Sequence, residues 1–284
     1  PVFQLSLDIS RKLESGDLGI ADLGGLVDEL EAQSLDARAN RLRNLLAPAD
    51  AGERLASLAS SGAAFDSYRA FWEQPHMHVV FTAHPTFLLS PQQSEAVAQA
   101  VANGGDVRPG AAGEAPEITL RYEHQCAMAA LANAQDARDR MVSAVLDRAQ
   151  AEFPGGWCEF QPLPFRFASW VGYDMDGRTD IKWYTSIAFR LSEKAQRLER
   201  YAAPLAAIDE AHPLIAKLRS AAEHAAASAD EFAGDLSDPA DLSAAANRLT
   251  ADHADKLLSL EPLIDRLETE ARDCAAERAV ALRT

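Results

Sequence analysis

The chain has 284 residues, of which 48% are hydrophobic, and its 43 acidic and 27 basic side chains give a net charge of −16. This charge disfavours nucleic acid and anionic membranes as partners, because both present negative phosphates. No stretch approaches the roughly 18 uninterrupted apolar residues of a membrane helix, and the three cysteines lack the C-x-x-C spacing of a zinc site. We therefore expect a soluble, cytoplasmic protein with reduced cysteines.

Helical patterns dominate the first part of the chain. Apolar residues recur at helical spacing from Leu23 to Leu46, and this pattern stops before Pro48. A second segment, from Tyr122 to Phe153, contains no glycine or proline and ends at a Pro-Gly-Gly turn. Between them, residues 102–116 are rich in glycine, and we expect them to form a connecting loop.

Residues 185–284 have the pattern of an α-helical bundle, which we expect to be distinct from residues 1–184. Ser192 is a candidate N-cap for the first helix of this region, and Pro213 can begin the second. Asp238-Pro239 separates the second helix from the third. Because alanine is abundant here, the helices can approach closely, and we expect a scaffold in this region.

Two short runs break the helical pattern. Val79 to Thr82 and Phe165 to Val171 are rich in β-branched or aromatic residues, and turn-forming residues follow them. A lone strand would leave its backbone groups unpaired, so each run needs a partner. Since a long helical connection joins the two runs, we expect a parallel pair from a sheet or barrel. Functional residues in such folds follow the carboxyl ends of the strands.

The first run continues as Phe-Thr-Ala-His-Pro-Thr, which places His84 directly after a strand and before Pro85. Proline restricts the preceding residue to extended conformations, so the backbone at His84 is stiff. An imidazole titrates near neutral pH and can take up or release a proton there. The alternative is a histidine that is hydrogen-bonded inside the core. His76 and His78 precede the strand, and we do not expect them to bind a metal.

The second run continues through residues 169–178 as Ser-Trp-Val-Gly-Tyr-Asp-Met-Asp-Gly-Arg. Its D-x-D-G segment is similar to the first motif of haloacid-dehalogenase-type phosphatases. There Asp174 would attack phosphorus and Asp176 would act as general acid and base, with Mg²⁺ bridging. That fold needs further alternating strands and helices, whereas alanine-rich helix follows here. A third interpretation is that these aspartates bind backbone amides in a turn.

Taken in this order, the two motifs resemble the signatures of the phosphoenolpyruvate carboxylase family. The segment from Val80 to Thr86 matches the family's V-x-T-A-H-P-T-E up to its glutamate, which is Phe87 here, and the arginine pair beyond it has no counterpart. The second family signature is S-W-M-G-G-D-R-D-G-N-P. Its arginine is Met175 here, and Arg178 is a candidate replacement; the matching positions are Ser169, Trp170, Gly172, Asp174, Asp176 and Gly177.

The resemblance implies a mainly α fold, in which a helical bundle accompanies a few strands of an incomplete β/α barrel. It covers roughly the amino-terminal third of a family member. The implied reaction joins phosphoenolpyruvate and bicarbonate into oxaloacetate and phosphate, with His84 taking the proton of a carboxyphosphate intermediate. The residues implied to bind substrate are Thr86, Asp174, Asp176 and Arg178.

The resemblance also implies groups that we do not find in this sequence. Mg²⁺ or Mn²⁺ would hold the substrate through ligands outside this chain, and the Gly-Arg-rich catalytic loop of the family does not occur. The implied partners are therefore the rest of the same polypeptide and further copies in a homo-oligomer, and we expect this segment alone to be inactive. A helical scaffold or regulatory protein of the same descent, without catalysis, is the alternative suggested by Phe87, Met175 and Thr179.

Overall fold

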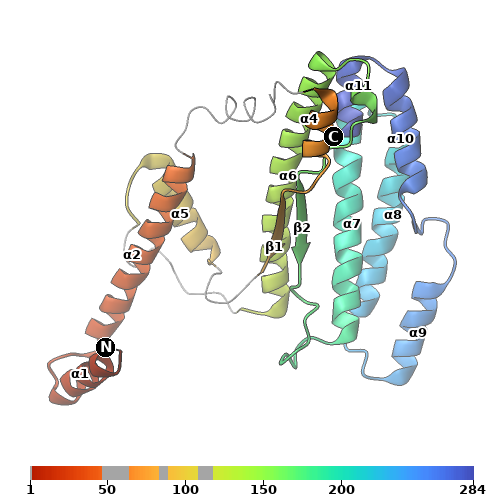
Figure 1. Cartoon of the computed structure of the whole chain (residues 1–284). Coiled ribbons are helices and arrows are strands. Elements are labelled where there is room, and N and C mark those ends of the chain that lie inside the picture. Colours follow the sequence, from red (N-terminus) through yellow and green to blue (C-terminus); the bar gives the residue numbers. More distant parts are fainter. Residues whose placement is uncertain (1, 47–63, 83–88, 108–117) are drawn as a thin grey trace. The chain divides into compact units, whose positions relative to one another are not determined.

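The structure is a computed structural model, and it describes residues 2–46, 64–82, 89–107 and 118–284 (Figure 1). The chain divides into two compact units. The first unit comprises residues 1–51 and 86–118, and the second comprises residues 52–85 and 119–284. Each unit therefore combines segments that are far apart in the sequence.

Helices account for most of the described residues, which confirms the prediction of a mainly α fold. In the first unit they are α1 (Val2–Ser15), α2 (Ile20–Leu46) and α5 (Pro91–Asn103). In the second unit they are α4 (Phe65–Trp72), α6 (Leu120–Glu152), the short 3₁₀ helix η1 (Trp157–Glu159), α7 (Trp183–Ile208), α8 (Pro213–Phe232), α9 (Pro239–Thr250), α10 (Glu261–Asp273) and α11 (Ala276–Arg283). The two predicted long helices correspond to α2 and α6.

The first unit is held together by α2 and α5. Their buried apolar cluster consists of Leu35, Ala39, Val97, Ala100 and Val107. The start of α5 is fixed by a capping box, in which the Ser90 hydroxyl accepts from the Gln93 backbone amide and the Gln93 side chain accepts from the Ser90 amide. Most of the predicted loop at 102–116 lies outside the described residues.

In the second unit, α7 and α8 lie side by side (Figure 1) and pack through apolar side chains. Pro213 is the first residue of α8, and Asp238-Pro239 separates α8 from α9, as the sequence predicts. The structure adds that the Asp238 side chain caps α9 by accepting from the Ala240 amide at 2.7 Å. The prediction for Ser192 is wrong, because α7 already begins at Trp183 and passes through it. Burial of Ala188 and Phe189, which precede Ser192 in α7, favours this earlier start.

The described residues contain two strands, β1 (Met77–Phe81) and β2 (Phe165–Ser169). They pair in parallel, with Met77 opposite Phe165 and Phe81 opposite Ser169. The prediction of a parallel pair is therefore confirmed. α6 lies beside this pair and forms part of the connection between the two strands (Figure 1).

The compact units differ from the division expected at residue 184. α7 shares its surroundings with α6 and with the turn after β2, so a boundary at its start would cut through one packed region. The His124 ring of α6 stacks on the Phe189 ring of α7 with 4.0 Å between centroids. The Tyr173 hydroxyl of the turn donates to Glu193 of α7 at 2.5 Å.

Candidate functional site

The carboxyl ends of β1 and β2 lie next to each other, because Phe81 and Ser169 are partners in the sheet. The segments that begin at Thr82 and Trp170 therefore leave the sheet at the same edge. His84 and Thr86 lie outside the described residues, so their roles stay predictions. What the structure shows is that Thr82, the last described residue before His84, follows β1 at the edge where β2 ends and the second motif begins.

The turn after β2 packs closely against α7. Gly172 adopts a positive φ of 88°, and its carbonyl accepts a hydrogen bond from the Ser186 hydroxyl at 2.7 Å. Within the turn, an Asp174 carboxylate oxygen accepts from the Asp176 backbone amide at 3.2 Å. This contact agrees with the interpretation that Asp174 binds a backbone amide.

Arg178 is engaged by two acidic side chains. Its guanidinium lies 2.7 Å from an oxygen of Asp180 and 3.2 Å from an oxygen of Glu123. The hydrogen bond from Arg178 lowers the pKa of Asp180 below its ordinary value. Glu123 is buried on α6, where its side chain is 5% exposed. The arginine proposed from the sequence as an anion ligand therefore neutralises carboxylates of its own chain.

Glu193 of α7 is the centre of a partly buried polar network that the sequence did not predict. One of its oxygens accepts from the Tyr173 hydroxyl at 2.5 Å and from His124 Nε2 at 3.0 Å, and the other lies 3.3 Å from Arg190. Burial alone would raise the pKa of Glu193. The hydrogen bonds from His124 and Tyr173 and the charge of Arg190 outweigh burial, so its pKa is lowered.

This network explains part of the divergent second motif. Tyr173 stands where the resembled signature has glycine, and its hydroxyl connects the turn after β2 to α7. Its ring also lies 4.3 Å from the guanidinium of Arg190. The pKa of Tyr173 is raised by burial and by its bond to the Glu193 carboxylate. Tyr173 thus holds the turn in place as a neutral hydrogen-bond donor.

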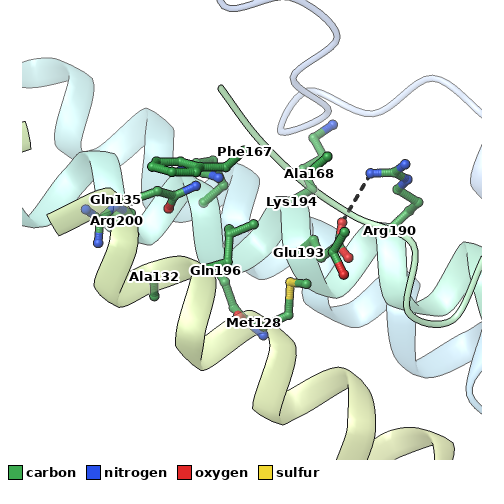
Figure 2. A pocket seen from close by; sticks show the side chains of 13 residues that line it. Met128, Ala132, Gln135, Phe167, Ala168, Arg190, Glu193, Lys194, Gln196 and Arg200 are labelled. Atoms are coloured by element: carbon green, nitrogen blue, oxygen red, sulfur yellow. Dashed lines mark hydrogen bonds and ion pairs between the residues drawn. The ribbon is translucent and has the colours of Figure 1, made fainter. Parts of the chain in front are cut away.

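A pocket of about 480 Å³ lies among α6, β2 and α7 (Figure 2). α6 and β2 contribute mostly apolar or amide side chains, whereas α7 contributes charged ones. Ser169, the last residue of β2, reaches the pocket from the strand. The full lining is Met128, Leu131, Ala132, Gln135, Phe167, Ala168, Ser169, Arg190, Glu193, Lys194, Gln196, Arg197 and Arg200.

Among the described residues, no three histidine, cysteine or acidic side chains are arranged to hold a metal ion. His76 precedes β1, as predicted, and places its Nε2 atom 2.7 Å from the Phe71 carbonyl oxygen. The same prediction for His78 is wrong, because His78 lies within β1. None of the described helices is both long enough and apolar enough to cross a membrane.

Comparison with known proteins gives no relative for this chain: no family model, no curated protein and no solved structure matches it.

Proposed function

We propose that this chain is the amino-terminal part of a phosphoenolpyruvate carboxylase-like enzyme. In this enzyme His84 accepts the carboxyl proton of the carboxyphosphate intermediate. The observation that carries the proposal is the parallel, in-register pairing of β1 with β2. This pairing brings the starts of both motif segments to one edge, where catalytic residues of parallel β/α folds are found. The further strands that would complete a β/α barrel are part of the proposal only.

The proposed chemistry begins when bicarbonate attacks the phosphorus of phosphoenolpyruvate, which gives carboxyphosphate and an enolate. His84 then takes the carboxyl proton, and carboxyphosphate breaks down to CO₂ and inorganic phosphate. The enolate carbon captures CO₂ to form oxaloacetate. Histidine suits this role because it can accept a proton at neutral pH.

Other groups of the proposed site must come from outside the described residues. The carboxylates that are described form no cluster suited to Mg²⁺ or Mn²⁺, so no step is assigned to a cation held here. We propose that further polypeptide supplies the cation ligands and phosphate-binding arginines, and that the intact enzyme is a cytoplasmic homo-oligomer. Residues 1–284 alone are then expected to form no oxaloacetate from phosphoenolpyruvate and bicarbonate.

The test is the His84→Asn substitution in the intact polypeptide. We expect the turnover number to fall by about 100-fold or more, because general acid–base groups contribute on the order of 10²–10⁴ to rate. The dissociation constant for phosphoenolpyruvate should change little. Oxaloacetate formation is followed by its coupled reduction, and binding is followed by calorimetry.

His78→Asn is the matched control, because His78 is an exposed histidine on β1 that the proposal does not use. It should leave both turnover and binding close to those of the parent protein. Equal losses of turnover and of phosphoenolpyruvate binding in His84→Asn would instead assign His84 a structural role.

A second candidate is a scaffold of the same descent that no longer catalyses. It is favoured by the engagement of Arg178 with Asp180 and Glu123, and by the use of Asp174 within its own turn. If the intact polypeptide shows no Mg²⁺- or Mn²⁺-dependent oxaloacetate formation, this candidate replaces the enzyme. The aspartyl phosphatase has less support, since the described residues after β2 form helices and no further strand.

A further inference from the structure

The pocket among α6, β2 and α7 concentrates positive charge in an acidic chain. Four basic residues of its lining lie on α7 at positions 190, 194, 197 and 200, a spacing that places them along one face of a helix. Glu193 is the one acidic residue in the lining, whereas the whole chain has a net charge of −16. Figure 2 shows Arg200 near the Phe167 ring, with Arg190 and Lys194 further along α7.

Two of these four charges are balanced by acidic side chains. Arg190 pairs with Glu193 at 3.3 Å. Arg200 of α7 lies 2.5 Å from Asp136 and 2.8 Å from Asp139, both on α6. The pairs of Arg200 also connect α7 to α6 beside the pocket.

The other two charges have no acidic partner in the part of the chain that the structure describes. Lys194 donates from its ammonium group to the Leu257 carbonyl at 2.5 Å. The guanidinium of Arg197 lies 6.0 Å from the centre of the Tyr201 ring. Burial lowers the pKa of Lys194, and the neighbouring charge of Lys256 lowers it further. A bound anion would balance the charge of Arg197.

We propose that this pocket binds a small organic anion with two or more negative charges, and that Arg197 is its principal ligand. A guanidinium can donate two parallel hydrogen bonds to a phosphate or carboxylate group. Gln135 and Gln196 add amide donors, and Met128 and Phe167 offer an apolar wall for a carbon skeleton. The pocket volume of about 480 Å³ is in the range of small-ligand sites.

The inference does not rest on the carboxylase proposal, because it uses neither His84 nor the turn residues Asp174 and Arg178. The pocket lining shares only Ser169 with the second motif. Phosphorylated compounds and polycarboxylates share the chemistry that the pocket recognises. Two probes distinguish these ligand classes in the experiment. Pyrophosphate represents the phosphorylated compounds, and citrate represents the polycarboxylates.

Isothermal titration calorimetry of the 284-residue chain with each probe, at constant ionic strength, tests the proposal. We expect at least one probe to bind. Its dissociation constant should be larger when the titration is repeated at a higher salt concentration. Arg197→Gln should weaken that binding by about tenfold or more, the expected effect of losing a charge-assisted hydrogen bond. A stronger response to pyrophosphate assigns a phosphorylated ligand, and a stronger response to citrate assigns a polycarboxylate.

Arg219→Gln is the matched control, because it removes the same charge from an exposed position on α8. It should leave the dissociation constant within about twofold, since Arg219 is not part of the lining and salt screens exposed charges. Gln196→Glu is a second variant that adds a negative charge to the lining while leaving Arg197 in place, and it should weaken binding as well. The proposal is overturned if neither probe binds at about 10 mM, or if Arg219→Gln and Arg197→Gln weaken binding equally.

Discussion

Arg178 and Glu123 form an ion pair whose partners differ strongly in exposure. The Arg178 side chain is 39% exposed, whereas that of Glu123 is 5% exposed. Loss of the arginine would leave a buried carboxylate with less compensation, and desolvation makes such a group costly. The pair therefore contributes to the fold of the turn whatever the turn binds.

We expect Arg178→Leu to lower the free energy of unfolding by about 1–3 kcal/mol, the usual cost of leaving a buried polar group unsatisfied. Solvent screening at the exposed guanidinium favours the lower part of that range. Arg178→Lys should cost less, because it keeps the charge and loses the forked geometry. Urea denaturation followed by circular dichroism measures each value.

A double-mutant cycle with Glu123→Gln separates the pair from the other contacts of Arg178. If Arg178→Leu costs as much in the Glu123→Gln background as in the parent, the buried carboxylate is not the cause. Asp180, which also binds Arg178, would then account for the loss.

The network around Glu193 marks the limit of sequence reasoning at the residue scale. His124, Tyr173 and Glu193 are separated in the sequence, and no spacing pattern links the three. Their meeting depends on the packing of α6 against α7. The one available signal was Tyr173 in place of the glycine of the resembled signature, and its consequence becomes visible only when Glu193 is placed beside it.

At the scale of elements, the turn after β2 contains two glycines with positive φ that differ in their surroundings. A Cβ atom at Gly172 would lie 2.3 Å from the ring of Phe189, whereas one at Gly177 would meet nothing within 4 Å. Both positions are strained for other residues, because their φ angles are 88° and 68°. Only at Gly172 does close packing also exclude a side chain, because the Phe189 ring occupies the space.

We expect Gly172→Ala to lower the free energy of unfolding by about 2–4 kcal/mol, from backbone strain and overpacking together. Gly177→Ala is the matched control and should cost about 1 kcal/mol, from backbone strain alone. Chemical denaturation of both variants gives the difference. Similar costs for the two variants would show that Phe189 moves aside and that the turn tolerates a side chain.

The existence of the strand pair and the starts of α8 and α9 were predicted correctly, because their local signals are strong. The parallel strands followed from short β-branched and aromatic runs joined by a long helical connection, and the starts of α8 and α9 followed from Pro213 and Asp238. Ser192 was wrongly assigned as a cap because its local preference is weak. Tertiary packing of the residues before it, including Phe189, keeps α7 helical from Trp183 onward.

At the scale of the whole molecule, the described apolar clusters each belong to one compact unit. The cluster of α2 and α5 lies in the first unit. A cluster that includes Tyr68, Val145 and Phe160 joins α4 to α6 in the second unit, and a further cluster joins α7, α8 and α10. The sequence did not predict this division, because the second unit combines residues 52–85 with residues 119–284, and no composition change marks such a discontinuous pairing.

The division predicts that the second unit folds without the first. In a variant that begins at Gly52 and replaces residues 86–118 by a flexible Gly/Ser linker of about 12 residues, we expect helical circular dichroism and one cooperative urea transition. The physical reason is that burial of apolar side chains drives folding, and the clusters of the second unit retain their members. Loop closure should cost little, because its entropy changes slowly with loop length.

The same variant carrying Leu146→Ala is the control, because Leu146 is fully buried in the cluster that joins α4 to α6. This substitution should lower the free energy of unfolding by about 2–5 kcal/mol, the usual cost of removing a large buried side chain. If the parent linker variant unfolds without cooperativity, or if Leu146→Ala leaves its stability unchanged, then the core of the second unit does not form by itself. The strand pair β1–β2 would in that case need residues of the first unit, and the candidate site would have to be assigned to the whole chain.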